Sequence, residues 1–157
     1  MSDDPALTLD SLQRDVLAPQ IQAFLDATSD PAAREVYLRL RDAVDRLEVP
    51  PDLAARLGAI VEVALQSGRI RKLFGAGADL ALNALFQRTP RGREIAESIV
   101  ALNIALARLK GQPIDDLSAT LRAPGSYSLT IRTASCQIVI RFEQAGVRVE
   151  SLELETR

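Results

Sequence analysis

The stretch TPRGREIAESIVALNIALARLKG, residues 89–111, decides the fold expected for this chain, because it predicts the longest and most sharply bounded helix. Thr89 supplies a side-chain acceptor for the free N–H groups at the helix start, and Pro90 suits the first helical position. Gly111 supplies the left-handed residue that ends the helix. The apolar residues lie almost all the way round it, namely Ile95, Ala96, Ile99, Val100, Leu102, Ile104, Ala105, Leu106 and Leu109. Such a helix is normally buried on several sides, so we expect the rest of the chain to cover it.

The residues before this stretch predict further helices, separated by proline and glycine. The first helix is expected to start at Thr8 or Asp10, and Pro19 predicts a kink or two short helices that meet there. Apolar residues at helical spacing predict later helices over 31–47 and 52–67, a short helical turn over 69–74 and a helix over 78–87. Together they predict a bundle of four to five helices over about residues 8–111.

After Gly111 the pattern changes from helical spacing to alternation. A short helical turn is expected over 114–121, followed by strands over 126–132, 136–143 and 147–154. The apolar phase changes at Glu150 and Ser151, which predicts a β-bulge. Three strands with one apolar face need a covering layer, so we expect this β-meander (about residues 126–155) to pack on the last long helix. The predicted fold is therefore α+β, in a single domain over residues 1–157.

Composition indicates a soluble protein of one domain. The chain has 157 residues, of which 47% are hydrophobic and 25% charged, and its net charge is −2. The single cysteine, Cys136, excludes an intrachain disulfide and is compatible with a reducing compartment. The start MSDDPALTLD lacks the order of a signal peptide, and no apolar run reaches the ~18 residues of a membrane span. We therefore expect a cytoplasmic protein without membrane segments, and the scarcity of lysine beside abundant alanine and leucine suggests a bacterial source.

The residues offer no catalytic constellation. The chain contains no histidine, which removes the commonest general base, most zinc sites and every Ser-His-Asp arrangement. Cys136 is in phase with Ile138 and Ile140, which favours a buried core thiol over a nucleophile. Of the two acidic pairs, Asp3-Asp4 falls in an expected tail and Asp115-Asp116 is typical of a helix start. We therefore predict no catalytic residue, no metal, no cofactor and no enzymatic activity.

Positive charge concentrates in the middle third of the chain. Residues 58–111 hold eight basic and four acidic side chains, net +4, whereas residues 1–57 hold six and eleven, net −5. The candidate binding residues lie on either side of the predicted helix 78–87: Arg69, Arg71, Lys72, Arg88, Arg91 and Arg93. If they converge, they form a patch for RNA, DNA or an acidic protein surface; otherwise they lie a helix length apart. Few aromatic residues are nearby for base stacking, so pairing with the acidic first third is favoured over a nucleic-acid site.

These patterns favour a non-enzymatic interaction or adaptor module that binds a protein partner. Formation of a homo-oligomer is a further possibility. Asn103 lies in the middle of the apolar run and needs a hydrogen-bond partner if it is buried. It is therefore the first residue to check for contact with a second chain.

Three segments resemble the closing β-meander of RelE/HigB-type toxins: YSLTIR at 127–132, CQIVIRFE at 136–143 and GVRV at 146–149. The resemblance covers about thirty residues. It implies helices packed on an antiparallel sheet, a ribosome-associated mRNA endonuclease ancestry and a neutralising antitoxin partner. Arg132 and Arg141 match basic positions of that meander. Since residues 154–157 are LETR, without the His or Tyr common near the end of such toxins, the alternative function is residual RNA or ribosome binding.

Overall fold

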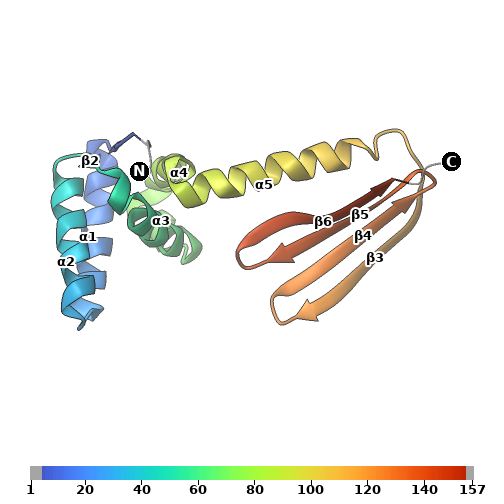
Figure 1. Cartoon of the computed structure of the whole chain (residues 1–157). Coiled ribbons are helices and arrows are strands. Elements are labelled where there is room, and N and C mark those ends of the chain that lie inside the picture. Colours follow the sequence, from blue (N-terminus) through green and yellow to red (C-terminus); the bar gives the residue numbers. More distant parts are fainter. Residues whose placement is uncertain (1–4, 155–157) are drawn as a thin grey trace. The chain divides into compact units, whose positions relative to one another are not determined.

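The computed structural model describes residues 5–154, which divide into two compact units, one up to Arg93 and one from Glu94. The chain passes from the first unit to the second within α5 (Pro90–Ala107). The described part contains five helices and a four-stranded antiparallel sheet, so the α+β class is confirmed with one strand more than expected (Figure 1). Whether the two units fold as a single domain stays a prediction.

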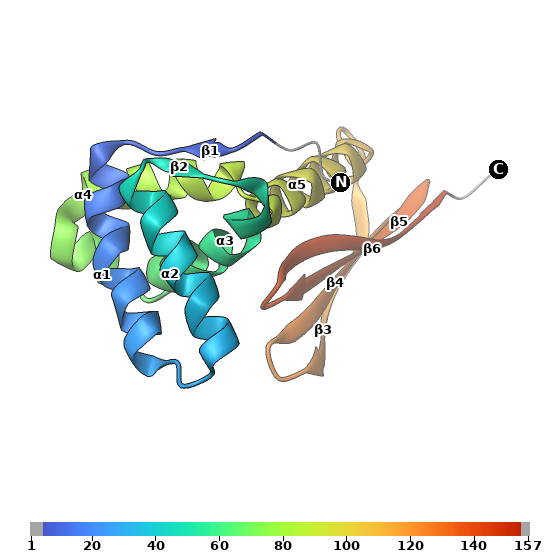
Figure 2. The same cartoon turned by 60° about the vertical axis from the view of Figure 1, so that its left-hand side comes forward.

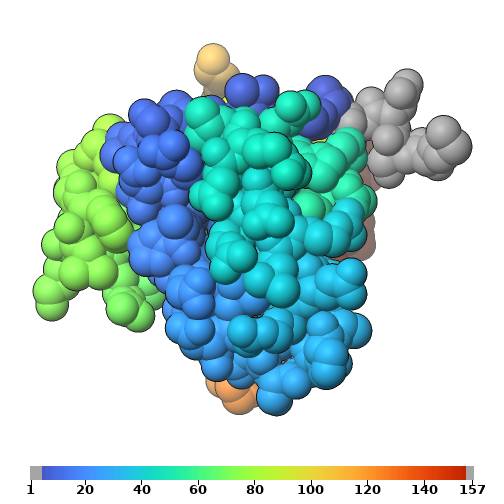
Figure 3. Space-filling model, turned by 90° about the vertical axis from the view of Figure 1, so that its left-hand side faces the viewer, coloured from blue at the N-terminus to red at the C-terminus, as the bar shows by residue number. Residues whose placement is uncertain are grey.

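The first unit is built from four helices that enclose one apolar core. They are α1 (Ser11–Ala27), α2 (Pro31–Asp45), α3 (Pro51–Gln66) and α4 (Arg69–Arg88). A short pair of strands that the sequence pattern did not predict, β1 (Leu7–Thr8) and β2 (Glu48–Val49), joins antiparallel beside them (Figure 2). On the surface, α1 and α2 lie side by side, with part of α4 next to α1 (Figure 3). The fully buried side chains include Leu17, Ile21, Leu25, Leu40, Leu57, Ile60, Ile70, Leu82 and Leu85.

Aspartates begin the first two helices, as their sequence positions predict. The Asp10 carboxylate accepts a hydrogen bond from the Gln13 N–H at 2.7 Å, and the Gln13 side chain accepts one from the Asp10 N–H at 3.0 Å. The Asp30 carboxylate caps α2 by accepting hydrogen bonds from the Ala32 and Ala33 N–H groups, without a reciprocal side-chain bond. The expectation of two short helices at Pro19 is wrong, because α1 continues through this residue. Burial of Leu17 and Ile21 on both sides of it offsets the missing hydrogen bond.

α4 consists of two helical pieces separated at Gly75, which confirms the separate turn and helix expected over 69–87. Each piece of α4 is shorter than α5, which at 18 residues is the longest uninterrupted helix among the described residues, as expected. Gly75 interrupts α4 with φ 87° and ψ 176°, a conformation that glycine adopts without steric cost. Ile70 before the break and Leu82 after it are both fully buried, so both pieces of α4 are held to the core.

A tight corner joins α4 to α5. The buried Thr89 hydroxyl donates to the Phe86 carbonyl at 2.6 Å and accepts from the Gly92 N–H at 3.1 Å, which confirms Thr89 as the cap of α5. A Cβ added at Gly92 would lie 1.9 Å from the Phe86 oxygen. One added at Gly58 in α3 would lie 3.1 Å from the Thr89 hydroxyl. Glycine is therefore required where α5 starts across the end of α4.

The second unit holds an antiparallel sheet in the order β3-β4-β5-β6. The strands are β3 (Ile114–Ala123), β4 (Ser126–Thr133), β5 (Cys136–Glu143) and β6 (Gly146–Leu154). The short helical turn expected over 114–121 is wrong, because these residues form β3. Asp115 and Asp116 lie in this strand, so their interpretation as a helix start is also wrong. Ile114, Leu117 and Leu121 are three and four residues apart, which imitates helical spacing.

The strand register places the apolar residues on one face. Ile131 lies opposite Ile138, and Leu129 lies opposite Ile140. Between β5 and β6, Val139 pairs with Ser151 whereas Ile140 pairs with Val149, which leaves Glu150 extra and confirms the predicted bulge. β3 has further register shifts near both of its ends, between 114 and 116 and between 121 and 123.

α5 packs on this apolar face, as expected for the last long helix. The core of the second unit comprises Leu102, Ala105, Leu106, Leu109, Leu129, Ile131, Cys136, Ile138, Ile140, Val147 and Val149. Ser98 adds a hydrogen bond to the Val147 carbonyl at 2.6 Å. The expectation that α5 is buried on several sides is wrong, however. Ile99, Val100 and Ile104 are 40%, 57% and 62% exposed, because the sheet covers only one side of α5.

Two alanine substitutions, one at this corner and one outside it, are expected to have opposite effects on the free energy of unfolding. Gly92→Ala is expected to lower the free energy of unfolding by roughly 1–3 kcal/mol, because its Cβ meets backbone atoms. Gly77→Ala is the matched control, since nothing lies within 4 Å of its Cβ position in α4. It is expected to raise stability by roughly 0.5–1 kcal/mol. Urea unfolding followed by circular dichroism measures both values, and equal effects of the two substitutions would contradict the packing described for the corner.

Candidate functional site

The six basic residues of the predicted patch fall into two groups along α4. Arg69, Arg71 and Lys72 lie before the break at Gly75 and are exposed, and the others lie at or after the end of the helix. The piece of α4 between them, 76–88, is a continuous helix of roughly 20 Å. The structure therefore places the two groups at opposite ends of this helical piece.

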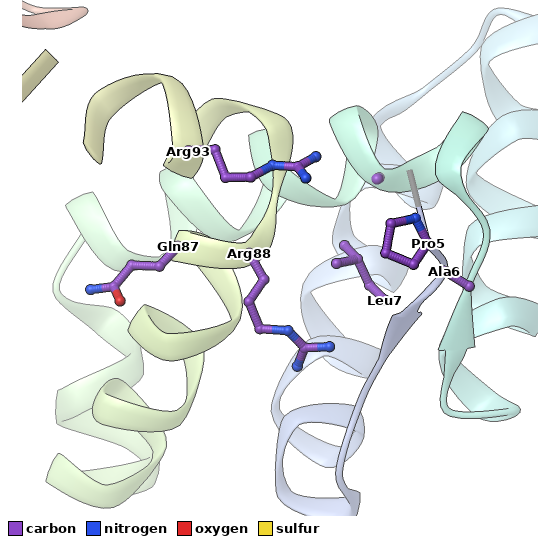
Figure 4. Close-up of a pocket in the computed structure, with 7 residues that line it drawn as sticks. Pro5, Ala6, Leu7, Gln87, Arg88 and Arg93 are labelled. Atoms are coloured by element: carbon purple, nitrogen blue, oxygen red, sulfur yellow. The ribbon is translucent and has the colours of Figure 1, made fainter. Parts of the chain in front are cut away.

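Arg88 and Arg93 share a cavity at the corner between α4 and α5. This cavity of about 300 Å³ lies in the first unit. Both side chains extend toward the segment that precedes α1 (Figure 4). An Arg88 guanidinium N–H donates to the Thr8 carbonyl at 2.9 Å, so this arginine holds β1 against the end of α4. The other lining residues are Pro5, Ala6, Leu7, Ala54 and Gln87. Two guanidinium groups suit an anionic group here, but both arginines already have partners.

The first basic group borders apolar side chains that the sequence pattern did not single out. Leu73 and Phe74 are 61% and 41% exposed just before Gly75. Neither Arg69, Arg71 nor Lys72 forms an ion pair within residues 5–154. Pairing of these three with the acidic first third is therefore not observed in that part of the chain. Asp3-Asp4 lies outside the described residues.

Arg132 and Arg141, the residues matched to the toxin meander, lie on the polar face of the sheet, away from α5. Arg141 in β5 lies opposite Ser128, which is four residues from Arg132 in β4, so the two arginines are roughly 13 Å apart along the strand direction. Arg132 donates to the Gln137 side chain at 3.0 and 2.7 Å. Arg141 forms ion pairs with Glu143 at 3.7 Å and with Glu150. Each arginine already has partners on this face, and an RNA phosphate would compete with them.

Cys136 is a core residue, as its phase with the neighbouring isoleucines predicts. Its side chain is 1% exposed and its sulfur lies 3.4 Å from the Thr133 hydroxyl. That hydroxyl donates to the Gln112 side-chain oxygen at 2.8 Å. The Ser135 hydroxyl donates to the same oxygen at 2.5 Å. This network connects the turn between β4 and β5 to Gln112, which follows α5. The Cys136 thiol is therefore part of the packing of the second unit.

The most conspicuous surface is an apolar patch on the sheet. We call Leu117, Leu121, Tyr127 and Phe142 the sheet patch; their exposed fractions are 58%, 63%, 52% and 42%. Leu121 lies opposite Tyr127, which lies opposite Phe142, so the patch crosses three strands. Leu117 lies opposite the buried Ile131, so the patch is on the face that α5 covers elsewhere. No residue of β3 belongs to the buried core. Because residues 114–121 were interpreted as helical, the sequence analysis did not place Leu117 and Leu121 on the apolar face of the sheet.

The described residues contain no cluster of three metal-binding side chains. Within residues 5–154, no helix combines the length and apolar character that a membrane span requires. No family model, no curated protein and no solved structure matches the chain. Its function is therefore inferred from the chemistry of its own residues.

Burial of Cys136 predicts slow reaction with thiol reagents. In the native protein, labelling by dithionitrobenzoate is expected to be at least about 100-fold slower than in urea, because the thiolate must be exposed to attack. A Thr120→Cys variant with Cys136→Ala is the matched control, since residue 120 is exposed on β3. Equal native rates for the two thiols would contradict the buried position of Cys136.

Proposed function

We propose that this chain is a non-enzymatic module that binds a protein partner through the sheet patch. The observation that supports this function is the contrast between two parts of one apolar face. Ile131, Ile138 and Ile140 are buried against α5, whereas the sheet patch continues the same face without cover. Exposed apolar patches of this kind mark interaction sites in soluble proteins.

The chemistry of the patch favours a protein over a small anion or a nucleic acid. Burial of four large apolar side chains that are about half exposed contributes roughly 3–6 kcal/mol. Association costs a comparable amount, so the partner needs further contacts around the patch. Leu117, Leu121 and Phe142 offer no hydrogen bond to a phosphate or a base edge, and a partner with its own apolar face complements them.

The two sides of β3 give a sharp test of this function. A photo-crosslinking residue at Leu121 lies in the sheet patch, and the same residue at Thr120 lies on the opposite face one position away. In native cells, Leu121 is expected to yield a discrete protein adduct that Thr120 does not. Leu117→Lys should reduce that adduct several-fold, because it places a charge in the interface.

Mass spectrometry of the adduct identifies the partner class. Identical adducts from both positions, or none from Leu121, would contradict the proposed function. An adduct that ribonuclease removes would favour the alternative, RNA or ribosome binding in the manner of a RelE/HigB-type protein. Circular dichroism of each variant checks that the fold is retained.

A further inference from the structure

The side of α5 that faces away from the sheet carries a second apolar surface. We call it the outer stripe: Ala96, Ile99, Val100, Asn103, Ile104 and Ala107, all exposed. Residues 96, 100, 103 and 107 are separated by four, three and four positions, the spacing of a helix that pairs with another helix. The opposite side of α5 is already occupied, since Leu102 and Ala105 contact the sheet.

The outer stripe has the composition of a helix contact rather than of a solvated face. A helix packed on one side normally carries charged and polar residues on the other. Here the only polar member is Asn103, between Val100 and Ile104, which are 57% and 62% exposed. Alanine at each end, Ala96 and Ala107, lets a second helix approach closely.

Two charges flank the outer stripe at its opposite ends. Glu97 and Arg108 are eleven residues apart, which is about three helical turns, so they lie on the same flank roughly 16 Å apart. Arg108 follows α5 in a turn in which its N–H donates to the Ala105 carbonyl at 3.1 Å. Neither side chain has an ion pair within the described residues.

We propose that a second copy of this chain binds the outer stripe, with the two α5 helices antiparallel. In this pairing Val100 lies against Asn103 of the second copy, and Ala96 lies against Ala107. The same alignment brings Glu97 to within about 3 Å, along the helix axis, of the level of Arg108. In an antiparallel pair related by a twofold axis, the flank that carries Glu97 and Arg108 faces the same flank of the second copy. Glu97 of each copy therefore forms an ion pair with Arg108 of the other. A parallel pairing would bring opposite flanks together, so it would not place Glu97 opposite Arg108.

Asn103 and the length of the stripe set the strength of this association. A polar residue in an apolar seam lowers affinity but restricts the register and the number of helices. The stripe spans twelve residues, roughly 18 Å of helix, which is less than a standard interface requires. The dimer is therefore weak and concentration-dependent. Its formation is independent of partner binding by the sheet patch, so either proposal can fail while the other stands.

Sedimentation velocity of the full chain tests the surface. From about 10 µM to about 1 mM, the protein is expected to shift from monomer toward dimer. Val100→Glu should remain monomeric, and Asn103→Leu should tighten the dimer by roughly tenfold or more. Thr120→Glu, on the face of the sheet away from α5, is the matched control and should behave as the unmodified chain. A monomer throughout, or equal dimerisation of Val100→Glu, would overturn the proposal.

Charge exchange tests the orientation. Glu97→Arg and Arg108→Glu should each weaken the dimer several-fold, and the double variant should restore it, because antiparallel helices oppose these two residues. As a second measurement, Ala96→Cys and Ala107→Cys chains are mixed and oxidised, with Asn103→Leu in both to favour pairing. The mixed disulfide is expected to predominate over either symmetric one, since wrongly paired positions are roughly 16 Å apart. Predominance of the symmetric disulfides would overturn the antiparallel arrangement.

Discussion

The contact between α5 and the apolar face of the sheet is the constraint on which the second unit depends. A small antiparallel sheet is not stable in water when one of its faces is apolar and uncovered. Leu102, Ala105 and Leu106 supply the cover, and they meet Ile138 and Ile140 in the middle of the sheet. One helix is too narrow to cover four strands, so β3 stays outside this core. Both the stability of the unit and its exposed surface therefore follow from the width of a single helix.

Local patterns predicted most of the boundaries of the fold. Asp10, Asp30 and Thr89 cap helices because their side chains accept backbone hydrogen bonds that no other group satisfies. The bulge at Glu150 was predictable because, without it, Leu152 would lie on the opposite face of the sheet from Val147 and Val149. In each case the determining interactions lie within a few residues of one another. Sequence alone is sufficient for such features.

Features that depend on distant contacts were not predictable in the same way. Leu117 and Leu121 fit a helix and a strand equally well, and only pairing with β4 decides between them. The candidate basic site depended on where α4 places its two ends, which no local pattern contains. The apolar character of α5 was evident, but its sequence cannot reveal that Val100 and Ile104 lack neighbours. Sequence analysis therefore predicted helix caps and strand faces more accurately than the grouping of residues into surfaces.

The register shifts near both ends of β3 have a consequence for this edge of the sheet. An edge strand with unpaired N–H and C=O groups can add a strand from another molecule, but bulges twist the edge and interrupt that row. Asp115, Asp116 and Arg122 add charges along the same strand. Extension of the sheet by backbone pairing at β3 is therefore disfavoured. This strand therefore exposes Leu117 and Leu121 while its edge resists pairing with a strand of another molecule.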